Sequence, residues 1–329
     1  MVFLSVAVLA TFTVALALHG VGRVVPVPQQ VDWASIIAEK GSSDSIDGRS
    51  LSSSLTGGAE PVANRFPVPA VLRRSDRYVE VDIGQKPPSP VVDLLPRVGI
   101  AVSALDTPIL MYHHVGPLPS NPDAIRRGLT VSQGDFAAQV RLLATSGFQS
   151  ISLLDLMLAF RGYKQLPPKP VIITFDDGYD DNYRYALPIL KENGMKATFF
   201  IVTDLVGKTE YLTWQQITEM AGEGMSMQAH GVSHIDLSVL PPSQVLYQIT
   251  ESRRAIEAHT GRRVRFYAYP SGKFNDGVVA ALKENGYLAA ASTLYGTDHR
   301  ASEPFILKRV RVQGGESLQS FARKLKIAK

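Results

Sequence analysis

The chain has 329 residues, 45% of them hydrophobic, and a formal net charge of +4 at pH 7. This length can hold one large domain with extensions, and the mild, dispersed positive charge argues against nucleic acid as a partner. The chain has no cysteine, which excludes disulfides and thiolate metal ligands. Any metal must therefore be held by histidine and carboxylate side chains, a donor set that suits zinc and neighbouring transition metals.

The first predicted element is an uncharged apolar run over residues 2–18, which is typical of an export signal or a membrane anchor. We expect residues 1–22 to form this signal peptide or anchor, so that the protein is extracytoplasmic, either secreted or membrane-anchored. Residues 23–106 are rich in proline, serine and glycine and predict a spacer. The folded domain is then expected over residues 107–329, with its core at 169–312.

Eight short apolar segments of this domain predict strands, and most of them alternate with helical segments. Five follow a glycine that ends a helix, and three do not. The predicted strands are 109–112, 148–152, 171–175, 195–202, 225–229, 262–269, 287–293 and 306–312. This alternation predicts an α/β fold, a distorted (β/α) barrel of about seven to eight parallel strands.

Several polar residues follow predicted strands, on the face where barrels of this type carry their catalytic loops. The adjacent carboxylates Asp176 and Asp177 come directly after the strand at 171–175, and Gly178 lets the backbone turn sharply. Neighbouring carboxylates repel each other and are costly to bury unless a cation lies beside them or one holds a proton. A divalent metal at this strand end would resolve the conflict.

Histidines 230 and 234 are spaced as metal ligands often are. With Asp177 as the third ligand, His230 and His234 would leave a fourth metal position open to polarise a water molecule, with Asp176 as the base beside it. Each residue also has a simpler interpretation. The aspartates can cap a helix, and a histidine pair four residues apart also occurs by chance.

Three segments together resemble the polysaccharide deacetylases of carbohydrate esterase family 4, the NodB-homology family. They are Thr-Phe-Asp-Asp-Gly at 174–178, the segment 230–234 and Tyr-Ala-Tyr-Pro-Ser-Gly at 267–272, which resemble the family's first three motifs. The resemblance covers residues 107 to about 312. It implies removal of N-acetyl groups from an amino-sugar polysaccharide, such as peptidoglycan, poly-N-acetylglucosamine or a chitin-like polymer.

The resemblance also implies roles for individual residues. Asp176 is implied as the base, and Asp177, His230 and His234 as ligands of a divalent metal, with Zn²⁺ the first candidate. The backbone N–H of Ser271 is implied in binding the oxyanion.

The sequence departs from the usual family pattern at three places. Ala268 replaces the arginine of the third motif, no fourth motif is present, and the segment at Leu307 lacks the histidine that acts as acid. Met-Tyr-His-His-Val at 111–115 resembles the permuted arrangement of poly-N-acetylglucosamine deacetylases, in which the first histidine supplies the acid. This assigns the acid to His113, with His114 as its less favoured neighbour. It leaves open which residue tunes Asp176, with Arg265, Arg309 and Arg311 as the candidates.

The remaining expectations concern the substrate. Pro270 is expected beside the oxyanion site, and Tyr269, Trp214 and Leu307 as apolar walls around the acetyl methyl and sugar ring, with ordinary barrel packing as the alternative. The expected partners are the polysaccharide and, through residues 1–22, a membrane. Two other functions stay open at this point: an O-acetyl esterase on xylan or other acetylated glycans, and a catalytically impaired glycan-binding module.

Overall fold

The computed structural model describes Ile36 and residues 98–327, so the apolar run at 2–18 and nearly all of the expected spacer lie outside the described residues. Among the helices of the described part, none is both long and apolar enough to cross a membrane.

Seven parallel strands close into a barrel. Their order around the ring is β2 (Ile109–Tyr112), β12 (Leu307–Arg311), β10 (Ala289–Tyr295), β9 (Phe266–Ala268), β8 (Ser226–Ala229), β7 (Thr198–Ile201) and β6 (Pro170–Phe175). The parallel pairing of β6 with β2 closes the ring. A further parallel strand, β5 (Gln149–Ser150), pairs with β6 outside the ring. The prediction of a parallel (β/α) barrel is therefore confirmed, and each of the eight predicted segments contains a strand.

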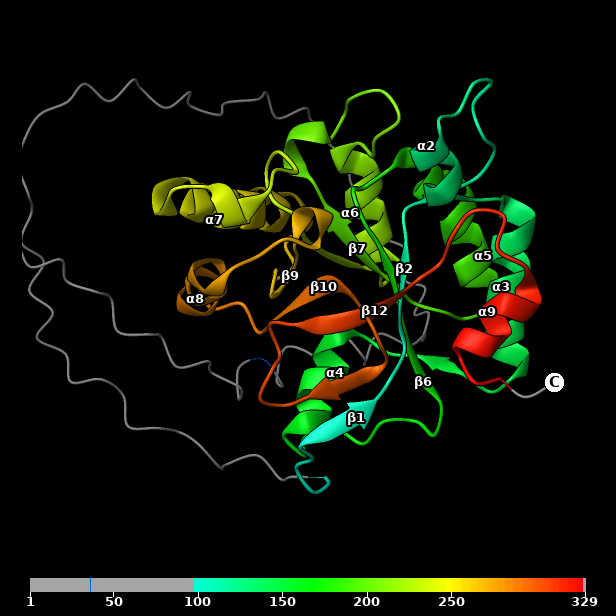
Figure 1. The fold of residues 1–329 in the computed structure, drawn as a ribbon, viewed down its shortest axis with the longest axis horizontal. Helices are drawn as coiled ribbons and strands as arrows, with labels where there is room; N and C mark the ends of the chain where they lie inside the picture. Colours follow the sequence, from blue (N-terminus) through cyan, green and yellow to red (C-terminus); the bar gives the residue numbers. More distant parts are fainter. Residues whose placement is uncertain (1–35, 37–97, 328–329) are drawn as a thin grey trace, which may run out of the picture.

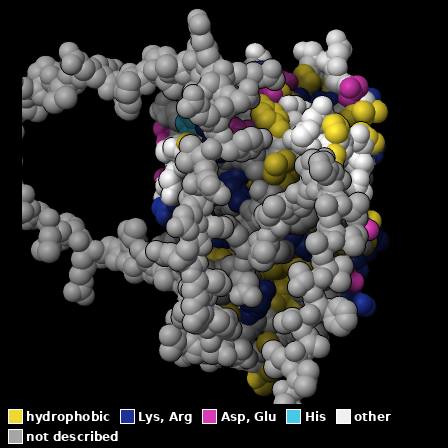
Figure 2. Space-filling view, turned by 90° about the vertical axis from the view of Figure 1, so that its left-hand side faces the viewer, with side chains coloured by type: hydrophobic (Ala, Val, Ile, Leu, Met, Phe, Trp, Pro, Cys, Tyr) yellow, Lys and Arg dark blue, Asp and Glu magenta, His cyan; other side chains and the backbone are white. Residues whose placement is uncertain are grey.

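Helices cover the outside of the barrel (Figure 1). The described helices are α2 (Ala124–Leu129), α3 (Gln133–Thr145), α4 (Leu153–Phe160), α5 (Leu187–Glu192), α6 (Trp214–Gly222), α7 (Pro242–Thr260), α8 (Asp276–Glu284) and α9 (Leu318–Lys324). In Figure 1, α3, α5 and α9 lie together on one side and α7 and α8 on the other. Seen from the side of α7 and α8, the described surface mixes hydrophobic side chains with charged ones (Figure 2), which is ordinary for a solvent-facing surface.

Short helical turns and two short strand pairs complete the fold. The turns are η1 (Asn182–Ala186), η2 (Thr203–Leu205), η3 (Leu237–Val239) and η4 (Pro270–Gly272). Strand β1 (Ala104–Asp106) pairs antiparallel with β11 (Asp298–Arg300), and β3 (His114–Val115) pairs with β4 (Thr130–Val131). The five glycines expected to end helices all have positive φ. This backbone conformation is the one in which glycine stops a helix.

Side chains alternate along each strand between the barrel interior and the helix layer. In β2, Leu110 and Tyr112 join the large cluster under the helices, while Ile109 joins a second cluster inside the barrel. The inner cluster includes apolar side chains of α4, and it gives way to polar residues toward the C-terminal strand ends, where Asp176, His230 and Arg309 are buried. The candidate site therefore lies at the C-terminal end of the barrel, next to the inner apolar cluster.

The hydrogen bonds of the domain begin before the expected boundary at residue 107. The amides of Val98 and Gly99 donate to the carbonyl of Gly162, each at 3.1 Å, and the amide of Val102 donates to that of Phe160 at 3.1 Å. Strand β1 follows directly. Residues 98–106 thus pack on the barrel rather than belonging to the spacer.

Candidate metal centre and active site

Asp177, His230 and His234 come together after strands β6 and β8. The Oδ1 atom of Asp177 lies 3.4 Å from Nε2 of His230 and 3.3 Å from Nε2 of His234. Ligands bound tetrahedrally to one zinc at about 2.0–2.1 Å lie about 3.3 Å from one another. The Asp177 Oδ1 atom is also buried without a hydrogen-bond partner, which is costly unless a cation binds there. The donor types, the spacing and this oxygen all fit one divalent metal.

Two of these residues have positive φ, a backbone conformation that residues other than glycine rarely adopt. Asp177 has a φ of 74° and His234 a φ of 49°. Residues held in this region are strained by about 1–3 kcal/mol, and such strain persists where the surrounding structure enforces it. The turn at Asp177 separates the two adjacent carboxylates, because Asp176 pairs with Arg309 while Asp177 meets the histidines.

His230 is oriented for metal binding by a backbone carbonyl. Its Nδ1 lies 2.7 Å from the carbonyl oxygen of Ala268. A carbonyl only accepts, so Nδ1 carries the hydrogen and the lone pair of Nε2 faces Asp177. Burial raises the pKa of Asp177, but the electrostatic effect of the neighbouring histidines, His230 above all, lowers it by more, so the net pKa lies below the ordinary value. The carboxylate is therefore ionised at neutral pH.

Asp176 is held by a buried arginine from another strand. The Nη1 and Nη2 atoms of Arg309 donate to Oδ1 and Oδ2 of Asp176 at 2.7 and 2.8 Å, and Nε donates to the carbonyl of Ser292 at 2.8 Å. Burial raises the pKa of Asp176, whereas the charge and hydrogen bonds of Arg309 lower it, and the net direction is downward. Arg309 of β12 thus places a guanidinium beside Asp176, whereas Ala268 of β9 stands where the third motif usually has an arginine.

The two neighbouring histidines have different surroundings. His113 is buried, its Nδ1 has no hydrogen-bond partner, and its pKa responds to the charges of Asp176 and Asp177. Burial is the largest influence and lowers the pKa of His113 to about 4. Strand β2 pairs with β6 so that Tyr112 lies opposite Phe175, and His113 and Asp176 are the residues that directly follow this pair.

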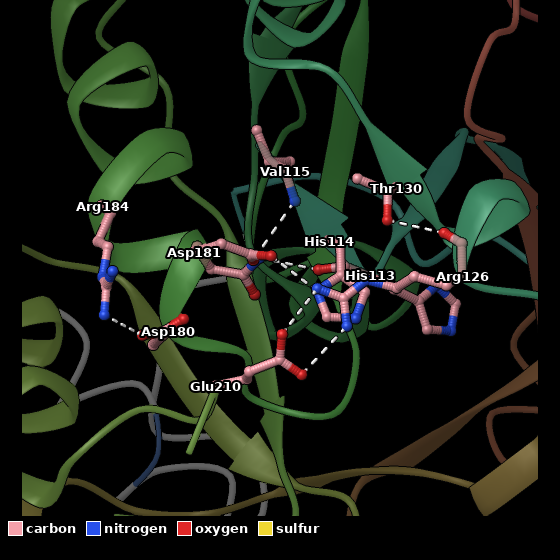
Figure 3. Close-up of polar contacts among 10 residues, drawn as sticks. His113, His114, Val115, Arg126, Thr130, Asp180, Asp181, Arg184 and Glu210 are labelled. Atoms are coloured by element: carbon pink, nitrogen blue, oxygen red, sulfur yellow. Dashed lines mark hydrogen bonds and ion pairs between the residues drawn. The ribbon is translucent and has the colours of Figure 1, made fainter. Parts of the chain in front are cut away.

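His114, the first residue of β3, contacts a different set of residues. Its Nδ1 lies 2.7 Å from Oδ2 of Asp181, and its ring stacks on that of Tyr179 with centroids 3.4 Å apart. Figure 3 shows this pair with the amide of Val115, which also donates to Asp181, at 3.4 Å. His114 is therefore a packed, paired side chain. Asp181 was not among the predicted site residues.

The segment at Pro270 forms the short turn η4 at the end of β9. Ser271 is exposed and has a φ of 56°. Gly272 must be glycine, because a Cβ there would lie 2.0 Å from Oγ1 of Thr293. Strand β10 thus packs against the turn that carries the Ser271 amide.

The three expected apolar walls are packing residues. Tyr269 is fully buried, stacks on Phe274 at 4.6 Å and donates to the carbonyl of Phe305 at 3.0 Å. Trp214 stacks on His259 with ring centroids 3.9 Å apart, and Leu307 belongs to the cluster inside the barrel. These contacts correspond to the alternative given above, ordinary barrel packing.

Comparison with known proteins places the chain in a family. The model of the polysaccharide deacetylase family matches residues 163–290, which include both aspartates and both histidines. YxkH of Bacillus subtilis, whose name places it among polysaccharide deacetylases, is 34% identical over 214 residues, 65% of this chain and 74% of YxkH. The chain belongs to the polysaccharide deacetylase family. Its carboxylate and histidine motifs are thus those of a known class of hydrolase.

The chain is also similar to a curated N-deacetylase and to a deacetylase of known structure. The poly-β-1,6-N-acetyl-D-glucosamine N-deacetylase of Escherichia coli K12 is 25% identical over 245 residues, and the match spans 61% of this chain but only 36% of that enzyme. The Streptococcus pyogenes deacetylase PplD, solved in complex with acetate, has a TM-score of 0.63 and 28% identity, covering 68% of this chain and 99% of PplD. The match therefore spans nearly the whole of the PplD chain.

Proposed function

We propose that this deacetylase is a metal-dependent hydrolase that removes N-acetyl groups from an amino-sugar polysaccharide outside the cytoplasm. The observation that carries the proposal is that three candidate metal ligands lie at the same end of the barrel as the Arg309-paired Asp176. Similarity to a poly-N-acetylglucosamine deacetylase supports an amino-sugar polymer and makes that polymer the first to test. Peptidoglycan and chitin-like polymers are the other candidates.

The proposed metal ligands are Asp177, His230 and His234, and the proposed ion is Zn²⁺. Two imidazole nitrogens and one carboxylate oxygen form a ligand set that catalytic zinc sites use. When bound, the metal supplies Lewis acidity that polarises water and the acetamide carbonyl.

Asp176 is the proposed base. Its pairing with Arg309 keeps the carboxylate ionised and fixed, so that it can accept a proton from the attacking water. The Ser271 N–H, at the turn beside Pro270, is proposed to donate to the oxygen of the acetyl group as negative charge develops there.

His113 is the proposed acid. With a pKa of about 4, it is neutral at pH 7 in the free protein. We therefore infer that the proton it gives to the departing nitrogen is the one that Asp176 takes from water. The C–N bond breaks, one water proton ends on the sugar nitrogen, which leaves as a free amine, and the water oxygen remains in acetate, which releases the second proton to solvent.

The proposed location depends on the apolar run at residues 2–18 and the proline-rich segment after it. Such a run would export the chain or attach it to a membrane, and residues 23–97 would space the catalytic domain from it. Of the other functions considered, the impaired module was motivated by the missing arginine and the missing histidine. The guanidinium of Arg309 beside Asp176 supports an active enzyme instead.

Metal analysis combined with acetate release tests the function. Purified protein should contain close to one zinc per chain and release acetate from β-1,6-linked N-acetylglucosamine oligomers. His234→Ala should weaken zinc binding by orders of magnitude and abolish release, since it removes one of three ligands. His259→Ala, which changes an exposed histidine outside the site, is the matched control.

Three results would count against parts of this proposal. Full zinc affinity in His234→Ala would remove the metal assignment. Acetate release from acetylated xylan but not from the amino sugars would make the protein an O-acetyl esterase. Release from peptidoglycan or chitin oligomers alone would change only the polymer.

A further inference from the structure

The loop between the two candidate histidine ligands is held by one side chain from a distant helix. Gln248 lies in α7 and is only 4% exposed. Its Oε1 accepts hydrogen bonds from the amides of Val232 and Ser233, at 2.7 and 3.1 Å. One amide oxygen thus pairs two consecutive N–H groups in the middle of the His230–His234 segment.

The opposite side of the same loop is also fixed. The carbonyl of Gly231 accepts from the amide of Thr203 at 3.2 Å, and that of Val232 accepts from the amide of Asp204 at 2.9 Å. The loop backbone is therefore bound by η2 on one side and by Gln248 on the other. Without Gln248, the buried amide of Val232 and the amide of the more exposed Ser233 would both lose this acceptor.

Gly231 has no side chain, and this leaves room for the side chain of Gln248 beside the loop. Gly231 has a φ of +83°, and a Cβ at this position would lie 3.1 Å from Oε1 of Gln248 and 2.9 Å from the hydroxyl of Tyr267. The glycine thus gives Gln248 the space to reach the amides. The close approach is specific to this loop and this helix.

The two histidines depend on the loop to different degrees. The ring of His230 is fixed separately by the carbonyl of Ala268. His234 is at the far end of the loop. Its side chain is 35% exposed, and its own φ is 49°. The position of its Nε2 relative to that of His230 is therefore set by the backbone that Gln248 binds.

We propose that Gln248 is a positioning residue that sets the distance and orientation of His234 relative to His230 and Asp177. The inference rests on the proposed metal site. Partners outside the ligand set typically change metal affinity by about 10–100-fold when they are removed. Gln248 differs from most of them because it acts on the ligand backbone and not on a ligand ring.

The test compares three variants of the full chain by metal binding. Gln248→Met has a similar length and no acceptor, Gln248→Glu keeps an acceptor oxygen, and Gln244→Met changes an exposed glutamine one turn earlier in α7. Zinc affinity is measured by chelator competition, and site geometry by the visible absorption of the Co²⁺-loaded protein. Gln248→Met should bind zinc about 10–100-fold more weakly and show an altered Co²⁺ spectrum. The other two variants should stay close to the unmodified protein.

Several outcomes would overturn the inference. They are an unchanged zinc affinity and Co²⁺ spectrum in Gln248→Met, or an equal loss in Gln248→Glu or in Gln244→Met. If Gln248→Met does not fold, Gln248→Ala is measured in the same way, and an unchanged affinity there has the same meaning. If the unmodified chain binds no zinc or cobalt, the proposed function itself fails, which is a distinguishable result.

Discussion

Arg309 explains how a carboxylate can stay ionised inside the barrel. Transferring a carboxylate from water to a protein interior costs several kcal/mol, and removing one partner of a buried pair typically costs about 3–5 kcal/mol. Burial by itself raises the pKa of Asp176, and the guanidinium of Arg309 reverses that direction. The pair is therefore needed both for stability and for a base that is ready at neutral pH.

Replacing Arg309 with methionine should move the acidic limb of the pH dependence of kcat/KM to higher pH. A base works above its pKa and is lost as the pH falls through it, and losing the adjacent positive charge raises that pKa. Activity on an N-acetylglucosamine oligomer, measured across the acidic range, checks the shift. Lys308→Met, in the same strand but paired with the exposed Asp298, is the control. An unmoved limb in folded Arg309→Met would contradict the assigned role.

His113 can be tested through the leaving group. Positioned acids and bases contribute about 10²–10⁴-fold, so His113→Ala should lower turnover of an N-acetyl sugar within that range. An activated aryl acetate, whose leaving group needs no proton, should lose much less. Zinc content should not change. Equal losses on both substrates would mean that His113 serves folding or metal positioning, and a loss confined to His114→Ala would move the role by one residue.

The site residues differ in how far the sequence could reveal them. Asp176, Asp177, His230 and His234 stand in two short motifs, and the structure brings these residues together. Arg309 is 133 residues from its partner Asp176, and only the pairing of β2 with both β12 and β6 brings them within contact. A buried arginine in an apolar strand is nevertheless a usable signal, because such a charge is almost never buried unless it is paired.

At the scale of elements, the strands of the barrel were predictable because they are buried on both faces and read as apolar runs. The residues at which the strands begin and end were less predictable. The segment 262–269 contains only three strand residues, Phe266–Ala268, since Arg262 and Arg263 are exposed. Strands β1, β3, β4 and β11 have two or three residues each and too little pattern to be detected.

The helices between the strands explain why the role of Gln248 could not be predicted. Gln248 is one of several polar residues along α7, and nothing in its local sequence separates it from the exposed Gln244. Only the packing of α7 against β8 shows that one faces the loop and the other faces solvent. Its role follows from tertiary contacts alone.

At the scale of the whole molecule, the barrel interior extends to a residue of the expected spacer. Ile36 is 7% exposed and belongs to the inner cluster with side chains of α4. Burying an isoleucine side chain stabilises a fold by about 1.5–3 kcal/mol. The segment before residue 98 therefore contributes at least one buried apolar contact to the catalytic domain.

This contact predicts how a shortened chain behaves. A chain of residues 98–329 should fold and deacetylate, because it keeps β1, the barrel and every proposed site residue. It should be less stable than residues 23–329 by about 2 kcal/mol, measured as the free energy of unfolding in urea. Ile36→Ala in the longer chain should reproduce most of that loss. Equal stability of the two chains would show that Ile36 contributes nothing, and an insoluble or inactive 98–329 chain would show that the earlier segment is essential to the fold.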